Sequence, residues 1–271
     1  MTDTDGQLDA FAAWERGTWE TRSAAYAASL TELTRGAADA LLDAAEVTSA
    51  TTVLDVATGP GVVALAARER GAEVIAVYQS GAMVALARSA GLDARQAKVE
   101  RLPFDTDAFD AAVAGFLVNH LPRPAEGIAE LARVSTSRVA VSVWDLPAAN
   151  PALGLFGPLT QALDMPDSVP TGPDSSLYAD DARLTALLVA GGLLDVRILR
   201  VRWAVTVDPG AWFDAIAEGT PRTGAVLAAA PPEQLADLRM RYVATARASY
   251  GSGGGLVTLP ATAVVGSGRP A

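Results

Sequence analysis

A glycine-rich turn in the stretch LDVATGPG is the first place in the chain where residue types and spacing point to chemistry. Gly59 and Gly61 stand between a short apolar run that contains Asp55 and an apolar helical pattern. Glycine lets a backbone turn sharply and approach a ligand closely, and a helix N-terminus offers free N–H groups. Asp55 can accept a ligand ammonium group or orient the loop. The stretch predicts a cofactor site; a tight strand–helix connection without a ligand is the plainer alternative.

A second candidate is His120, the only histidine of the chain. It follows the apolar run GFLVN, at the expected carboxyl end of another strand, where open α/β sheets bind their ligands. An imidazole there can act as a general base near neutral pH. A contact to the cofactor or to the loop backbone is an equally weighted alternative.

Several other chemistries are excluded by what the sequence lacks. There is no cysteine, so thiolate catalysis and thiolate metal sites are ruled out. Neither the G-x-S-x-G pattern of serine hydrolases nor the P-loop pattern occurs. With a single histidine we predict no metal site, leaving open only a magnesium site made of carboxylates.

The elements that must position these residues alternate between strands and helices. Continuous apolar runs such as AEVIAVY, FDAAVAGFLVNH and SRVAVSVW are separated by helical patterns. Strands of this kind are typical of a parallel sheet that is covered on both faces. We therefore predict an α/β fold with a doubly wound, mostly parallel, seven-stranded Rossmann-like sheet and a helical cap.

The domain organisation follows from the same pass along the chain. Residues 1–47 are expected to form an N-terminal helical cap, in which Leu33, Ala37, Leu41 and Ala45 share one stripe. Residues 48–271 are expected to form the core. Lid insertions are expected near 145–180, which is rich in Pro and Gly, and near 208–254, where Asp208 and Pro209 can begin a helix.

Composition limits the partners and the location. The net charge of −10 disfavours binding to nucleic acid or to an anionic membrane. The acidic N-terminus is unlike a signal peptide, and no apolar run approaches the roughly 20 residues of a membrane span. We expect a soluble cytoplasmic protein with a small-molecule substrate and no nucleic-acid or membrane partner. A homodimer is left open.

Five stretches together resemble the class I S-adenosylmethionine (SAM)-dependent methyltransferases, in the small-molecule branch that is similar to the menaquinone and ubiquinone enzymes. They are VLDVATGPG, ERLPFDTDAFDAAV, FLVNHLPRPAEGIAELARV, RVAVSVWDLP and LPATAVVGSGRP. The resemblance runs from about residue 14 to the end and implies SAM as cofactor and an antiparallel last strand. It also implies that Asp55, Gly59 and Gly61 hold the methionine part of SAM. A dinucleotide site is less favoured, because that fold places its first glycine directly after the strand and an acid about 20 residues later.

Two positions depart from the family pattern. Tyr78 ends the second strand, where the family has an acid that binds the ribose hydroxyls. Lys98, the only lysine, stands where the family has an acid that accepts the adenine amino group. A phenol makes one hydrogen bond in place of two charge-assisted ones, and a lysine accepts none. The loss of two such bonds costs roughly 3–6 kcal/mol of binding, so SAM is either bound weakly or held by other contacts.

The leading prediction is SAM-dependent methyl transfer to a small, apolar metabolite, with His120 as the catalytic residue. The alternatives are a methyltransferase-fold enzyme that catalyses cyclisation or rearrangement or uses a variant cofactor, and a non-catalytic small-molecule binding protein. The predicted cofactor-binding residues are Asp55, Ala57, Gly59, Gly61, Tyr78, Gln79, Met83, Lys98, Val99 and Glu100. The predicted substrate-binding residues are the aromatic Trp19, Tyr26, Trp144, Phe156 and Trp212.

Overall fold

A single mixed sheet organises the chain in the computed structural model, which describes residues 3–161 and 163–271. Its strands are β1 (Thr52–Val56), β2 (Glu73–Tyr78), β3 (Asp93–Gln96), β4 (Phe109–Gly115), β5 (Ser135–Trp144), β6 (Leu193–Val207), β7 (Gly251–Gly253) and β8 (Leu256–Pro270). The strand order is β3-β2-β1-β4-β5-β8-β6, and β7 pairs with β8. Strands β1 to β5 pair in parallel, whereas β8 is antiparallel to both β5 and β6. The predicted α/β class and the antiparallel last strand are confirmed.

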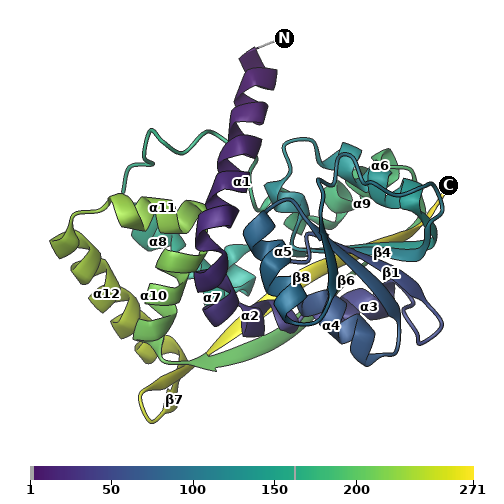
Figure 1. Ribbon diagram of the computed structural model, residues 1–271. Coiled ribbons are helices and arrows are strands. Elements are labelled where there is room, and N and C mark those ends of the chain that lie inside the picture. The colour runs from purple at the N-terminus through teal and green to yellow at the C-terminus, as the bar shows by residue number, and fades with distance from the viewer. Residues whose placement is uncertain (1–2, 162) are drawn as a thin grey trace.

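Helices connect the strands and cover the sheet (Figure 1). They are α1 (Asp3–Ser29), α2 (Thr31–Arg35), α3 (Ala38–Ala44), α4 (Val62–Glu69), α5 (Gly81–Ser89), α6 (Pro124–Val134), α7 (Pro151–Gly154), α8 (Gly157–Thr160), α9 (Asp181–Ala190), α10 (Pro209–Gly219), α11 (Arg222–Ala229) and α12 (Pro232–Tyr250). Short 3₁₀ turns are η1 (Val118–His120), η2 (Pro147–Ala149) and η3 (Leu177–Ala179). In the described part of the chain, no helix has both the length and the apolar character that crossing a membrane requires.

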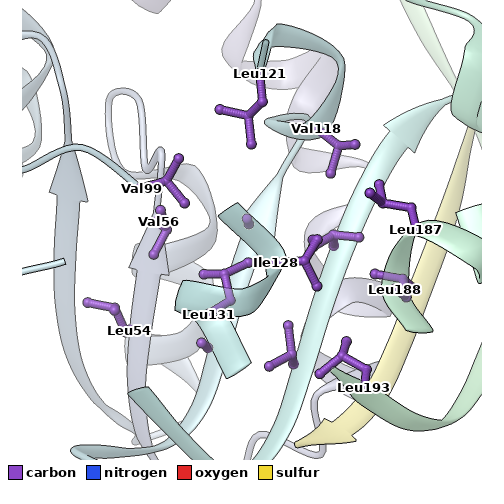
Figure 2. Close-up of a cluster of buried hydrophobic side chains, with 14 of the residues drawn as sticks. Leu54, Val56, Val99, Val118, Leu121, Ile128, Leu131, Leu187, Leu188 and Leu193 are labelled. Atoms are coloured by element: carbon purple, nitrogen blue, oxygen red, sulfur yellow. The ribbon is translucent and has the colours of Figure 1, made fainter. Parts of the chain in front are cut away.

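Two apolar layers hold the helices against the sheet. On one face, Ile128 and Leu131 of α6 and Leu187 and Leu188 of α9 pack against the strands (Figure 2). On the other face, α3, α4 and α5 cover β1, β2 and β4. All four residues of the predicted N-terminal stripe are buried there or beside it, as the helical spacing predicts. The sheet is thus covered on both faces, and the carboxyl ends of its strands are left to carry a site.

A third layer lies beside the sheet. Strands β6 and β8 extend beyond the parallel strands, and their pairing continues to Val207 and Val257. Helices α10 to α12 lie beside this extension (Figure 1). These helices pack around Phe213 and Tyr242, and α10 contacts α1. As predicted, Asp208 is the N-cap of α10: its carboxylate accepts a hydrogen bond from the backbone N–H of Ala211.

Three elements differ from the sequence prediction. The fourth strand was predicted to reach His120 but ends at Gly115, because Phe116 adopts a left-handed backbone with φ of 55° and the chain then enters η1. Helix α11 was not predicted, since its stretch RTGAVLAA is short and contains glycine and threonine, which have low helix propensity. Gly251 to Gly253, expected in a turn, form the short strand β7 against β8.

Candidate cofactor and substrate site

A cavity of ≈ 270 Å³ opens at the carboxyl ends of β1, β2, β4 and β5. The loop after β1 lines it, together with residues of α1, α2, α3, η1 and the start of α11. The cavity therefore brings together segments that are separated by more than two hundred residues of sequence, from Glu15 to Thr223. The glycine turn and His120 both line it, as predicted from their positions at strand ends.

Asp55 fixes the shape of the loop after β1. Its Oδ2 accepts hydrogen bonds from the hydroxyl of Thr58 at 2.6 Å and from the backbone N–H of Ala64 at 3.0 Å, which ties the loop to the first turn of α4. Its Oδ1 is buried and has no hydrogen-bond partner among the described residues. Burial raises the pKa of Asp55 to about 7, and the hydrogen bonds from Thr58 and Ala64 oppose this shift. One carboxylate oxygen therefore orients the loop, and the other is left to accept a ligand donor.

The two glycines of the turn have different roles. Gly59 has φ of 56°, and a Cβ added there would meet no atom nearer than Cε1 of Tyr26 at 4.0 Å, so this side of the glycine faces open space. Gly61 has φ of 102°, and a Cβ there would collide with the side chain of Leu92. Gly59 lines the cavity, whereas Gly61 allows close packing of α4 against the segment before β3.

The ends of β2 and β3 form the wall that was predicted to bind ribose and adenine. Tyr78 lines the cavity and is 9% exposed. The pKa of its phenol is raised well above the ordinary value, first by burial and then by the nearby Tyr26 and Glu15. The other predicted members of this wall that line the cavity are Gln79, Met83, Val99 and Glu100, and Ala57 lines it from the β1 loop.

Lys98 does not lie where it was predicted. Its side chain is exposed and is not among the residues that line the cavity. Lys98 and Arg101 close a tight turn, in which the N–H of Arg101 donates to the carbonyl of Lys98 at 3.2 Å. Ala97, Val99 and Glu100 of this segment line the cavity, whereas the side chain of Lys98 is exposed to solvent.

His120 of η1 belongs to a hydrogen-bonded group with two side chains of α1. Its Nδ1 lies 3.1 Å from Oε2 of Glu15, a residue of α1 that is 2% exposed. The indole N–H of Trp19 donates to the same oxygen at 2.8 Å, and the Trp19 ring stands edge-on to the imidazole with centroids 5.6 Å apart. The sequence analysis did not find Glu15, because it lies 105 residues from His120 and belongs to no motif. The only sequence signal was its place beside the tryptophans in WERGTWE.

An aromatic pair forms another part of the cavity wall. Trp144 at the end of β5 stacks on Phe116, with ring centroids 3.8 Å apart and planes at 15°. The backbone N–H of Phe116 is held by the carbonyl and the hydroxyl of Ser142 at 2.9 and 3.1 Å. These bonds sustain the left-handed conformation of Phe116, which is unfavourable for a bulky residue.

The predicted substrate-binding aromatics are divided by the structure. Trp19, Tyr26 and Trp144 line the cavity. Phe156 and Trp212 do not, because they are buried in the layer under α10 to α12 with 2% and 4% exposure. Their apolar surface is used for packing between helices, and the indole N–H of Trp212 donates to the carbonyl of Ala152.

Comparison with known proteins shows which family and which proteins this chain is similar to. A family described as "Methyltransferase domain" matches residues 54–140, which run from β1 to β5. Demethylmenaquinone methyltransferase of Mycolicibacterium gilvum is 29% identical over 169 residues, 57% of this chain and 73% of that protein. The uncharacterized protein Rv1405c of Mycobacterium tuberculosis is 28% identical over 262 residues, 89% of this chain and 93% of that one. Among solved structures, the YcgJ protein of Bacillus subtilis has a similar fold, with a TM-score of 0.57 at 18% identity, covering 87% of this chain and 98% of that one.

Proposed function

Because the chain belongs to the class I SAM-dependent methyltransferase family, we propose that it transfers a methyl group from SAM to a small, largely apolar molecule. The observation that carries the proposal is the single cavity in which the glycine turn and His120 meet. A cofactor bound along the turn and a substrate held near His120 would share one enclosed space. Enclosure of this kind aligns two reactants and excludes water.

The residues of the β1 loop fit SAM. The open side of Gly59 leaves room for a ligand to lie against the backbone. Asp55 and Asn119 line the cavity, and the buried Oδ1 of each has no hydrogen-bond partner within residues 3–161 and 163–271, so both oxygens can accept from an ammonium group. Asp55, Gly59 and Asn119 are thus the residues that would hold the methionine part of the cofactor. When bound, SAM supplies an electrophilic methyl group on a positively charged sulfur.

The substrate is expected to be largely apolar because many of the lining side chains are apolar. Phe116, Trp144, Leu33 and Leu153 line the cavity with aromatic and aliphatic surface. Burying such surface favours a ligand by about 25 cal/mol for each Å² removed from water. His120, which also lines the cavity, is the candidate general base.

Calorimetric titration with SAM and S-adenosylhomocysteine tests the cofactor, and mass spectrometry of products tests the reaction. Bound cofactor and a product heavier by one methyl group are the expected results. A product of unchanged mass would support cyclisation or rearrangement instead, and ligand binding without turnover would support a binding protein.

His120→Ala separates catalysis from binding. We expect turnover to fall by about 10²–10⁴-fold, because a positioned base contributes that factor, while the affinity for SAM stays within a few-fold. Weaker SAM binding with normal turnover at saturation would instead assign His120 to the cofactor site.

A further inference from the structure

A buried carboxylate in the wall of the cavity plays no part in the methyltransferase pattern. Glu15 lies on α1, is 2% exposed, and has its Oε2 between the imidazole of His120 and the indole of Trp19. Removing a carboxylate from water costs several kcal/mol unless hydrogen bonds and charge compensate. Both compensating contacts are made to one oxygen, and one of them is to the candidate base.

The hydrogen bonds determine which imidazole nitrogen carries the proton. The Trp19 N–H can only donate, so Oε2 of Glu15 accepts from it. The simplest arrangement gives the same carboxylate oxygen a second donor, which requires a proton on Nδ1 of His120. Nε2 is then left with a lone pair. Within residues 3–161 and 163–271 Nε2 makes no hydrogen bond, and the ring, whose side chain is 32% exposed, lines the cavity.

We propose that Glu15 is a positioning residue that holds His120 in the Nδ1–H tautomer, so that Nε2 accepts the proton of a hydroxyl group on the substrate. This inference rests on the proposed function. The hydroxyl proton moves to Nε2 as the oxygen forms its bond to the methyl carbon; the bond from that carbon to sulfur breaks and its electron pair stays on sulfur. The substrate class is therefore a small apolar molecule with a weakly acidic hydroxyl, such as a phenol or an enol.

The surrounding charges favour this arrangement. Glu15 interacts electrostatically with Arg222 of α11 and with the phenol of Tyr78 at the end of β2, and both side chains line the cavity. Arg222 offsets part of the buried negative charge, although it forms no direct ion pair with Glu15 in the described part of the chain. Three residues after His120, the N-cap of α6, Arg123, pairs with Asp9 of α1 at 3.2 Å, which adds a second contact between α1 and the chain that follows η1.

Nitrogen NMR of the imidazole tests the inference without any turnover. His120 is the only histidine, so its ring nitrogens are observed without overlap. At a pH where the ring is neutral, we expect Nδ1 protonated and Nε2 bare in the wild type. Glu15→Leu should shift the ring to the Nε2–H tautomer that free imidazole side chains prefer, whereas Glu15→Gln, which keeps an acceptor oxygen, should retain the Nδ1–H form in part.

The matched control is Glu20→Gln, which alters an exposed glutamate of the same helix that lies outside the cavity lining. It should leave the tautomer unchanged. Thermal unfolding of each variant shows whether it is folded. If the Glu15→Leu variant does not fold, the tautomers of the wild type and of the Glu15→Gln variant still test the proposal. An Nε2–H tautomer in the wild type, or an unchanged tautomer in a folded Glu15→Leu variant, overturns the proposal.

Methylation of 2-naphthol, used as a planar hydroxyl probe, provides the second readout. For Glu15→Leu we expect kcat to fall by about 10²-fold, at the lower end of a general base contribution, with KM for the probe changed by less than about 3-fold. Failure of SAM to bind in calorimetry would remove the proposed function and leave the tautomer result standing. Normal SAM binding with an unaffected tautomer would remove this inference alone.

Discussion

Two walls of the same cavity differ in how closely their residues match the family pattern. The loop after β1 matches the family pattern, and its shape is fixed from within by the bonds of Asp55 to Thr58 and Ala64. At the ends of β2 and β3, Tyr78 and Lys98 stand where the family resemblance predicts acids, and these two side chains are placed differently. Tyr78 is buried in the cavity wall, whereas Lys98 is exposed beyond it.

The difference separates the part of the site that depends on backbone from the part that depends on side chains. The glycine turn offers backbone N–H groups and open space, and it is held in shape by the side chains of Asp55 and Thr58 within the loop itself. The opposite wall depends on which side chains happen to end the strands. Of the two departures from the family pattern, only Tyr78 is therefore placed to alter ligand binding directly.

The largest effect is expected from Gly59→Val. A side chain there would fill the open space between the turn and Tyr26, so affinity for SAM should fall by at least about 100-fold. Calorimetric titration measures the loss. The chain should remain folded, because no atom lies within 4 Å of the added Cβ except the Tyr26 ring edge at 4.0 Å.

Gly192→Val is the matched control, since Gly192 also has a positive φ, 88°, and has open space around it away from the cavity. Both variants should lose a similar amount of stability, about 1–2 kcal/mol for a left-handed backbone. Unchanged SAM affinity in the Gly59 variant would show that the turn does not hold the cofactor.

A smaller effect, of opposite sign, is expected from Tyr78→Asp. A carboxylate at the end of β2 would restore charge-assisted acceptors for ribose hydroxyls, and one such bond is worth about 1.5–3 kcal/mol, or about 10–100-fold in affinity. Lys98→Asp should change SAM affinity by less than about 3-fold, because this side chain is exposed outside the cavity lining. Isothermal titration of both variants and of Tyr78→Phe measures the difference.

Weaker SAM binding in the Tyr78→Asp variant would show that the phenol of Tyr78 already contributes to binding of the cofactor. A gain from Lys98→Asp equal to that from Tyr78→Asp would contradict the distinction between the two positions. The Phe variant decides whether the hydroxyl or the ring is responsible.

The most condition-dependent effect concerns Asp55. Burial raises its pKa from 3.8 to about 7, so the folded protein retains a proton that the unfolded chain releases in this range. This contribution to stability is present below pH 3.8, declines as pH rises, and is lost above about 7. In Asp55→Asn the amide oxygen can still accept from Thr58 and Ala64, and the pH slope should disappear.

Denaturant unfolding at a series of pH values measures this. The stability of Asp55→Asn relative to the wild type should increase across the window, by roughly 4 kcal/mol at about 1.4 kcal/mol per pKa unit. At the same time its affinity for SAM should fall, because an amide NH₂ in place of Oδ1 cannot accept from an ammonium group. Parallel pH curves for the two proteins would show that Asp55 titrates normally.

Much of the fold was predictable because it depends on local patterns. Continuous apolar strands, the N-cap Asp208 and the helix-ending glycines Gly71 and Gly91 each carry their signal within a few residues. The fourth strand was predicted too long because the apolar run continues to His120, and the turn at Phe116 depends on Ser142, which lies 26 residues away.

The site was predictable only where it follows strand ends. Asp55, Gly59 and His120 could be placed in this way, since parallel strands end at one edge. Glu15 could not be found, because its role depends on how α1 packs over that edge. Phe156 and Trp212 were misplaced because aromatic residues serve cores and ligand sites equally well.

The position of Glu15 on α1 has a kinetic consequence. Three residues of this helix line the cavity, namely Glu15, Trp19 and Tyr26, and one of them completes the hydrogen-bonded pair with His120. A displacement of α1 that admits or releases a ligand would part the carboxylate from the imidazole. Closure of the cavity and assembly of the base would then be one event, so the enzyme would be inert while open and its turnover would be limited by how fast the helix docks and undocks.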